Sequence, residues 1–377
     1  MKRNYISPDE ALLLVDKVDS RFKPVWEHRS RDHQIALARY FLPHNSQKPV
    51  LGPTRPRIVK WYCPFADQMD FPSGHRYCIN VYTGCDHQCV YCYAAGYEPE
   101  KASAKANFEK LIRKDMDDLE IFDVPPAPVH LSNSTDPFQP LEKRFGHTRY
   151  TLEQILEHRR RFTTVTLLTK NPLLPVQFGY IELFKALLDH QPDHSMYKDS
   201  RRHWPGFVIE VSLAFWQETA RIAYEPGAPT VKQRIEGIRA LHRAGIPLVL
   251  RIDPLFPRSP ITANPIKNMA DFGLPEAHTL EDLDNLISFA KEVDVKHIVY
   301  SAAKITQPRY RKLSKIMATL KKLYQVYAAP EKLIWQGGSS RLPFDVINQR
   351  IVNPFLEICH KHGVKAKFCK QNLIETP

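Results

Sequence analysis

Three cysteines stand close together in one short segment of this 377-residue chain. Cys85, Cys89 and Cys92 are separated by three residues and then by two. Three thiolates so close together on one loop can bind three irons of a [4Fe–4S] cluster and leave the fourth iron open to a substrate. A tetrahedral zinc ion would instead need a fourth ligand nearby, and His87 inside the loop is the candidate. The spacing alone leaves three hypotheses: a cluster, a zinc loop, or three buried thiols.

Polar side chains also stand where predicted strands end, and they are Ser134, Thr135, Asp136, Lys170, Ser212, Arg251 and Asp253. The carboxyl ends of parallel strands meet at one edge of a sheet, so we expect these side chains to share one rim with the cysteines. Each has a simpler interpretation as well. The Ser134–Asp136 stretch could close a turn, Lys170 could be a solvated charge, and Ser212 could be a satisfied core hydroxyl.

Short apolar, β-branched runs alternate along the chain with segments of helical period. The predicted strands are Cys78–Thr83, Pro128–Ser132, Thr164–Thr169, Phe207–Leu213, Pro247–Ile252 and Lys296–Ser301. The predicted helices are Ala102–Leu119, Thr151–Arg161, Tyr180–His190, Thr230–Ala244 and Leu280–Val293. This alternation predicts parallel βαβ units with right-handed crossovers. Six units are too few for a closed eight-stranded barrel, so we predict an α/β fold, a partial (β/α)6 TIM-type barrel with N- and C-terminal extensions.

Three regions are predicted along the chain. Residues 1–77 form an N-terminal extension with one helical stretch near Pro8–Asp19, residues 78–305 form the barrel core, and residues 306–377 form a C-terminal extension on the barrel. The polar insert Gln191–Pro205 is expected to be a loop. The C-terminal extension is predicted to contain helices near Tyr310–Tyr327 and Phe344–His362 and a last strand, Val364–Phe368.

Composition restricts the class of protein. Hydrophobic residues at 43% and charged residues at 25% are typical of a soluble globular chain. The formal charge of +12 favours polyanionic or phosphorylated partners. We expect no membrane span and no secretory signal, because the first apolar stretch is short and flanked by acids. Seven cysteines without such a signal favour a reducing, cytoplasmic location. The sequence gives no indication of oligomeric state.

The cysteine spacing, with an aromatic residue before the last cysteine and a strand before the loop, resembles the radical S-adenosylmethionine (SAM) superfamily. Further segments resemble its spore photoproduct lyase-like (DNA repair photolyase-like) branch, over about residues 78–370. They are Asn80–Cys85, Cys92–Ala94, Ser134–Pro140, Thr169–Asn171, Glu225–Pro226, Arg234, Pro254–Pro257 and Phe368–Lys370.

The resemblance implies roles for individual residues. Cys85, Cys89 and Cys92 would bind a [4Fe–4S] cluster that reductively cleaves SAM to a 5′-deoxyadenosyl radical, with an electron donor such as flavodoxin or ferredoxin. Ser134–Asp136 would contact the SAM amino group, Lys170 its carboxylate and Ser212 its ribose, while Arg251 and Asp253 are further cofactor-binding candidates. Tyr91 would pack against the cluster or the adenine. Tyr93 and Tyr97 would face the substrate, although plain core packing explains these tyrosines equally well.

One departure from the family pattern concerns a thiol. Spore photoproduct lyase has a cysteine, before its Thr-Ser-Asp stretch, that donates a hydrogen atom to the product radical; Asn133 stands in that place here. An amide does not easily give up a hydrogen atom. Four cysteines remain, and we expect them to be scattered structural thiols rather than a second cluster. They are Cys63, Cys78, Cys359 and Cys369.

Among these, Cys369 is the candidate for a catalytic thiol, because it is expected to end a strand next to the barrel. Glu225 and Arg234 are expected to form a structural ion pair. The leading functional hypothesis is a radical SAM enzyme acting on a nucleic acid base, in DNA lesion repair or base modification. The alternatives are radical modification of a nucleotide, a phosphorylated metabolite or a peptide, and a non-catalytic zinc protein that binds nucleic acid.

Overall fold

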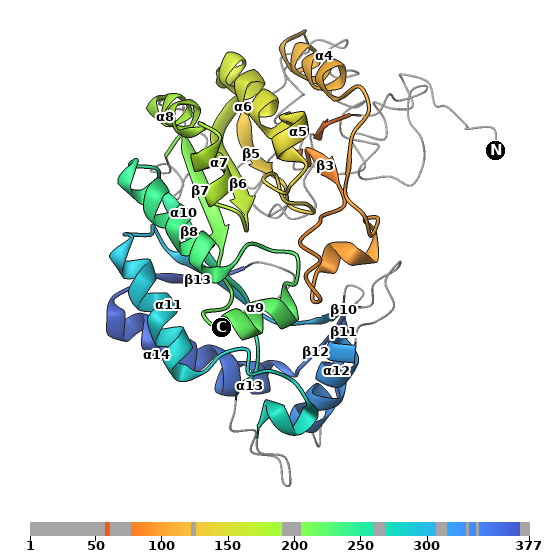
Figure 1. Ribbon diagram of the computed structural model, residues 1–377, viewed down its shortest axis with the longest axis vertical. Coiled ribbons are helices and arrows are strands. Elements are labelled where there is room, and N and C mark those ends of the chain that lie inside the picture. The colour runs from red at the N-terminus through yellow and green to blue at the C-terminus, as the bar shows by residue number, and fades with distance from the viewer. Residues whose placement is uncertain are drawn as a thin grey trace, which may run out of the picture.

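The computed structural model describes residues 57–60, 77–121, 126–190, 205–258, 268–306, 315–328, 332–336 and 339–369. In these ranges the chain has a mixed α/β fold built on a mostly parallel central sheet (Figure 1). The predicted helix near Pro8–Asp19, Cys63 and residues 191–204 of the predicted loop lie outside the described residues.

The central sheet has eight strands in the order β1-β2-β5-β6-β7-β8-β9-β13. The strands are β1 (Val59–Lys60), β2 (Tyr77–Ile79), β5 (Ala127–Leu131), β6 (Phe162–Thr169), β7 (Phe207–Ser212), β8 (Leu248–Leu255), β9 (Ile298–Ala302) and β13 (Ala366–Phe368). Only the pairing of β1 with β2 is antiparallel. The predicted parallel βα series is therefore confirmed, whereas no pairing between described strands closes the sheet into a barrel.

The first predicted strand, Cys78–Thr83, is wrong as one element. The carbonyl of Ile79 at the end of β2 accepts a hydrogen bond from Ser132 N, and the chain then leaves the sheet. Two residues later it forms β3 (Tyr82–Thr83), which pairs antiparallel with β4 (Ser103–Ala104). This small separate sheet carries the chain into the cysteine loop.

Helices follow most strands. They are α4 (Phe108–Ile121), α5 (Glu142–Phe145), α6 (His147–Glu157), α7 (Leu173–Gln177), α8 (Ile181–Asp189), α9 (Glu218–Tyr224), α10 (Val231–Arg243) and α11 (Leu280–Glu292). A capping box between Thr230 and Gln233 starts α10, and Gly245 follows its end at φ +77°, as the sequence pattern predicts. Figure 1 shows α8, α10 and α11 along one side of the sheet.

The two faces of the sheet differ in chemistry. One face carries buried apolar side chains in matching register, such as Leu167 beside Ile209. The alternate positions carry polar groups, with Cys78 beside His130 and Ser212 beside Arg251. Because side chains alternate between the faces of a strand, one face belongs to the core under the helices and the other, here called the inner face, is polar.

The C-terminal region contains a three-stranded antiparallel sheet that was not predicted, made of β10 (Ile305–Thr306), β12 (Ser339–Arg341) and β11 (Ile334–Gln336). Its helical segments are α12 (Lys315–Ala328), α13 (Phe344–Ile347), the π-helical turn Asn348–Val352 and α14 (Asn353–His362). The predicted last strand is confirmed as β13, parallel to β9. No helix in the described part of the chain is long and apolar enough to cross a membrane.

Candidate functional site

The cysteine loop begins directly after β3 and turns at a glycine. Gly84 has φ +71°, and a Cβ at this position would lie 2.8 Å from the Lys101 carbonyl oxygen and 2.9 Å from that of Pro99. Only glycine fits this backbone and this close approach. The amide of Cys92 donates to the Cys89 carbonyl at 3.1 Å, and a 3₁₀ turn, Tyr93–Gly96, follows. The loop is therefore compact and defined by its own backbone.

The loop is also bonded to the connection between β7 and α10. Gly227 N donates to the His87 carbonyl at 3.0 Å, and Val90 N donates to the Tyr224 carbonyl at 3.0 Å. A Cβ on Gly227 would lie only 2.1 Å from the Asp86 carbonyl oxygen, so the two segments are in direct backbone contact. Distant parts of the sequence thus hold the cysteine loop in place.

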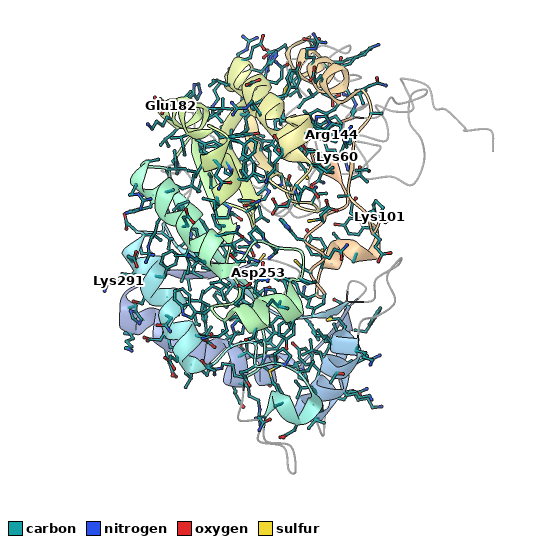
Figure 2. The ribbon with its side chains drawn as sticks, viewed as in Figure 1. Lys60, Lys101, Arg144, Glu182, Asp253 and Lys291 are labelled. Atoms are coloured by element: carbon teal, nitrogen blue, oxygen red, sulfur yellow. The ribbon has the colours of Figure 1, made fainter. Side chains whose placement is uncertain are left out.

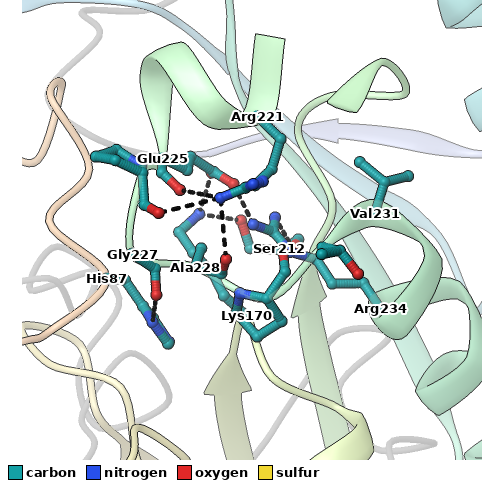
Figure 3. Close-up of polar contacts among 12 residues, drawn as sticks. His87, Lys170, Ser212, Arg221, Glu225, Gly227, Ala228, Val231 and Arg234 are labelled. Carbon is teal, nitrogen blue, oxygen red and sulfur yellow. Dashed lines mark hydrogen bonds and ion pairs between the residues drawn. The ribbon is translucent and has the colours of Figure 1, made fainter. Parts of the chain in front are cut away.

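His87 takes part in this attachment. Its Nδ1 lies 3.3 Å from the Gly227 carbonyl oxygen, as Figure 3 shows, and its Nε2 lies 3.1 Å from Asp136 Oδ2. The side chain is only 2% exposed, and it does not line the pocket that the three cysteines line. The zinc hypothesis had offered His87 as the fourth ligand, and these contacts give the ring a structural role instead.

All three loop cysteines line a single pocket of about 40 Å³, together with Ser134. Burial raises the pKa of the Cys85 thiol, and the Asp136 carboxylate and the other two thiols raise it further. Burial also raises the pKa of Cys89 to about 12, although the Lys170 charge acts in the opposite direction. Thiols in such a site become thiolates only with a cationic centre beside them.

The donor set suits a cluster better than a single ion. Among the described residues, no group of three His, Cys, Asp or Glu side chains is arranged to hold one metal ion. A zinc ion needs its ligand atoms to converge at about 2.0–2.3 Å, whereas each thiolate of a cubane cluster binds a different iron. Three thiols that line one pocket match the number that such a cluster takes from one loop.

An unsatisfied hydroxyl lies beside this pocket. Thr135 is buried, and its Oγ1 has no hydrogen-bond partner among the described residues. The amide of the adjacent Ser134 donates a 3.1 Å hydrogen bond to Asn80 Oδ1, and the Ser134 hydroxyl lies 2.8 Å from the Tyr97 hydroxyl. A buried hydroxyl without a partner costs free energy, so this position suits a bound polar ligand.

Asp136, by contrast, is engaged by the protein. Its Oδ1 accepts hydrogen bonds from Phe138 N and Thr169 Oγ1, both at 2.8 Å, and its Oδ2 accepts one from Lys170 N at 2.6 Å. Burial alone would raise the pKa of this carboxyl, but His87 and the two amides lower it below its usual range. Asp136 therefore joins β5, β6 and the cysteine loop.

Lys170 lies at the centre of a buried polar network (Figure 3). Its ammonium donates to Ser212 Oγ at 2.7 Å, to Glu225 Oε1 at 2.7 Å and to the Tyr91 hydroxyl at 3.0 Å. These three bonds use all three of its donors, so a carboxylate ligand would have to displace one of them. Burial alone would lower the pKa of Lys170, but Glu225 raises it above the usual value.

Glu225 also pairs with a second cation of the same network, Arg234. Arg234 lies 2.5 Å from Glu225 Oε2, and both side chains are fully buried, which confirms the predicted structural ion pair. Burial alone would raise the pKa of Glu225, but Arg234 and Lys170 hold it well below its usual range. The neighbouring Arg221 donates to the carbonyls of Glu225, Pro226 and Ala228, which fixes the segment that contacts the cysteine loop.

The predicted tyrosines have different surroundings. Tyr91 packs edge-on against Phe256, with ring centroids 5.9 Å apart, and donates to Glu225. Tyr93 and Tyr97 are 36% and 48% exposed and lie with ring centroids 6.2 Å apart. Tyr93 donates to the Asn133 carbonyl. Tyr91 thus belongs to the network around Lys170, while Tyr93 and Tyr97 stand at an open rim.

A second charged cluster lies on the inner face. Arg251 donates to Glu210 Oε2 and to Asp253 Oδ2, both at 2.6 Å, and lies 3.1 Å from Cys369 Sγ. Asp253 also accepts a hydrogen bond from Ser301. The charges of Arg251 and Asp253 act on Tyr93, which places this cluster and the exposed tyrosines near each other. The predicted residues Arg251, Asp253 and Cys369 are therefore brought together.

Some residues of the site were not predicted, and some predicted thiols lie apart from it. Glu210 and His130 were missed, although each is a polar residue at an alternate position of an otherwise apolar strand, which was the available signal. Cys78 lies on the inner face, and its Sγ accepts a 3.1 Å hydrogen bond from Asn133 Nδ2. Cys359 is buried within α14.

Comparisons with known proteins add the following. No family model matches the chain. The sequence is 25% identical over 186 residues to the uncharacterized protein MJ0683 of Methanocaldococcus jannaschii, which covers 49% of this chain. The match spans only 62% of that protein's length.

Solved structures of spore photoproduct lyase are similar in fold. A mutant of that enzyme aligns with a TM-score of 0.52 and 13% identity over 86% of this chain and 82% of its own. The complex of spore photoproduct lyase with the dinucleoside spore photoproduct aligns with a TM-score of 0.51 and 14% identity. This alignment covers 85% of this chain and 81% of the enzyme's chain. A mutant of the enzyme with bound SAM and the dinucleoside aligns with a TM-score of 0.50 and 14% identity over 98% of each chain. The expected resemblance is thus borne out for the fold.

Proposed function

We propose that this protein is a radical SAM enzyme whose [4Fe–4S] cluster is held by Cys85, Cys89 and Cys92. The observation that carries the proposal is the single pocket lined by these three thiols, placed after the first parallel strand of the sheet and beside Ser134. In this proposal the sheet is a partial barrel, and the polar inner face is its interior. Bound together, the reduced cluster and SAM supply a 5′-deoxyadenosyl radical for abstraction of a hydrogen atom from a substrate.

The chain's own residues bind and orient these groups. In this proposal Ser134 and Thr135, whose hydroxyl is unsatisfied, accept hydrogen bonds from the amino group of SAM, and Ser212, a partner of Lys170, contacts the SAM ribose. Lys170 needs one of its three present bonds exchanged to receive a carboxylate. Tyr91 excludes water behind the pocket, since its ring packs against Phe215 and Phe256. Asp136 and His87 hold the loop rather than the cofactor.

The substrate class we favour is a base of a nucleic acid. The charge of +12 suits contacts with phosphates, and a base must be displaced from its stack to enter a deep site. Spore photoproduct lyase, which is similar in fold, has been solved with a dinucleoside spore photoproduct. Tyr93 and Tyr97 stand at the rim where a flat base could stack. Filter binding of DNA at increasing salt tests this choice, because salt-insensitive or absent binding would favour a small substrate.

Anaerobic reconstitution with iron and sulfide tests the central proposal. The wild type should bind about four irons and, after reduction with dithionite, should release 5′-deoxyadenosine from SAM. Cys89→Ala should lose the cluster and the product. Cys359→Ala is a matched control, because it removes a buried thiol in α14 that does not line the pocket. A protein that binds zinc but no cluster, or SAM cleavage that survives Cys89→Ala, would contradict the proposal.

A further inference from the structure

Helix α5 presents two exposed cations and an exposed phenylalanine to solvent. Phe145 is 38% exposed, and the Arg144 guanidinium lies 5.1 Å from the centre of its ring. Lys143 lies 5.8 Å from the ring of Phe178, which is 43% exposed. Neither cation forms an ion pair with a carboxylate in the described part of the chain. Cations over exposed aromatic rings make a surface that suits an acidic protein partner.

Further basic residues continue this surface towards the strand pair that precedes the cysteine loop. The buried His147 ring lies 5.7 Å from the ring of Phe145 and stacks at 5.4 Å on the ring of Tyr82, which pairs with Ala104, so the two segments adjoin. Burial lowers the pKa of Lys105, the charge of Glu98 raises it, and the nearby charge of Lys60 lowers it. In Figure 2, Lys60, Lys101 and Arg144 lie along the same edge of the molecule. We call the following set the basic edge: Lys60, Lys101, Lys105, Lys143 and Arg144.

Acidic groups are present beside the basic edge. Glu100 and Glu109 are exposed, whereas Glu98 accepts a hydrogen bond from Gly84 N at 3.0 Å and so is partly engaged. The basic edge has five cations, and the exposed carboxylates Glu100 and Glu109 are too few to supply one for each of them. The basic edge therefore keeps an excess of positive charge.

The base of α5 is bonded to both sides of the first cysteine. Gln139, three residues before α5, donates from Nε2 to the Gly84 carbonyl at 3.3 Å. Its Oε1 accepts a hydrogen bond from Asp86 N at 3.1 Å. Gly84 and Asp86 flank Cys85 in the chain, so a short hydrogen-bonded route joins the surface of α5 to a proposed cluster ligand. Binding of a nucleic acid would require the positive charge of the basic edge. It would not require a hydrogen-bonded connection from α5 to a cluster ligand.

We propose that the basic edge is the docking surface of a small acidic electron-carrier protein of the flavodoxin or ferredoxin class. This inference rests on the proposed function, because the cluster must be reduced before it can act. One electron passes from the carrier to the cluster, the carrier is oxidised by one electron, and no atom is transferred. Complementary charge raises the association rate and orients the carrier over α5, while Phe145 and Phe178 supply apolar contact.

The test uses the full chain, reconstituted with its cluster, and an acidic flavodoxin as the probe. Lys143→Glu with Arg144→Glu should weaken flavodoxin binding about tenfold at low salt, since rim charges act mainly on association. Flavodoxin-driven release of 5′-deoxyadenosine should fall in parallel, while dithionite-driven release should not change. Lys232→Glu with Arg243→Glu is the matched control, because it makes the same change of charge at exposed positions of α10.

Each outcome decides the matter. Unchanged affinity in the α5 double variant overturns the proposal, and so does an equal loss in both double variants, which would reflect net charge alone. A wild type that binds DNA but no flavodoxin, with DNA binding lost in the α5 variant, assigns the surface to nucleic acid instead. If dithionite also yields no 5′-deoxyadenosine in the wild type, the proposed function fails, while the binding measurement still decides the docking surface. Circular dichroism checks that all variants fold.

Discussion

Two charged networks lie in this molecule, and their guanidinium–carboxylate pairs differ in how far water reaches them. In the first, the side chains of Arg234 and Glu225 are 0% exposed, whereas Lys170, which is bonded three times, keeps 15% of its side chain exposed. In the second, Arg251 and Asp253 keep 14% and 21% of their side chains exposed. Both join a guanidinium to a carboxylate at about the same distance, so distance alone does not distinguish them.

The comparison separates a structural role from a chemical one. A fully buried pair is held by its partners, and loss of either one leaves an uncompensated charge. A pair that water still reaches can exchange a partner for a ligand at lower cost. The Arg251 network also includes Cys369 and faces the exposed tyrosines, whereas the Glu225 network faces the segment that holds the cysteine loop. We therefore propose that the Arg234–Glu225 pair positions the segment that holds the cysteine loop, and that the Arg251–Asp253 pair is the better placed of the two for contact with a ligand.

The largest expected effect comes from breaking the buried pair. Arg234→Met should lower the free energy of unfolding by about 3–5 kcal/mol, because it leaves Glu225 buried with Lys170 as its only cation. Urea unfolding followed by circular dichroism measures this loss. Arg239→Met is the control, since Arg239 pairs with Glu292 at an exposed site of the same helix and should cost well under about 1 kcal/mol. Equal losses in the two variants would remove the distinction between the networks.

A smaller loss is expected at the partly exposed network. Arg251→Met should cost about 1–3 kcal/mol, because Glu210 and Asp253 lose a partner but stay within reach of water. The same change should raise the pKa of Cys369, since Arg251 now lowers it against the effect of burial. The rate of Cys369 alkylation by iodoacetamide at fixed pH should therefore fall. A faster alkylation would contradict the assigned electrostatics.

Acid should destabilise the protein through these carboxylates. The pKa values of Glu225 and Glu210 lie below their usual value of 4.5, because the cations beside them outweigh burial. Such groups stabilise the fold fully above the unfolded-state pKa, and the contribution is lost as pH falls through the lower folded-state pKa. The free energy of unfolding should thus fall below about pH 4.5, and Glu210→Gln should reduce that fall by about 1–2 kcal/mol. Unfolding curves between pH 7 and pH 3 measure the difference.

The smallest expected effect on the free energy of unfolding comes from replacing the thiol of Cys369. Cys369→Ser should change the free energy of unfolding by less than about 1 kcal/mol, because the thiol is only partly buried and serine can keep a polar contact with Arg251. If Cys369 acts on the substrate, product formation should fall much more than stability does. Turnover measured beside urea unfolding separates the two effects. Equal loss of both would make Cys369 a structural residue.

Much of the fold could be predicted from local pattern, and the failures have physical causes. The alternation of apolar runs and helical segments located the parallel strands, including β13. The run Cys78–Thr83 read as one strand because the turn between Ile79 and Tyr82 depends on a bond from Ser132, far along the chain. The antiparallel sheet around β12 likewise depends on partners that periodicity does not reveal.

The candidate site was predictable only where it depends on local sequence. Strand ends gave Lys170, Ser212 and Arg251, because position after a strand is a local property. That Lys170 already has three partners could not be predicted, since Glu225 and Tyr91 reach it from other segments. Asp136 shows the same limit, because its acceptors are satisfied by residues of a neighbouring strand.

The backbone contact between the cysteine loop and Gly227 bears on how the loop would behave without a bound cluster. The loop is fixed by hydrogen bonds to residues 224–227 that involve no sulfur. If the proposed cluster is lost, we expect the loop to keep its shape, so that the same molecule could accept a new cluster without refolding. Replacement of Gly227 by any other residue should remove this property, because a Cβ would collide with the Asp86 carbonyl oxygen.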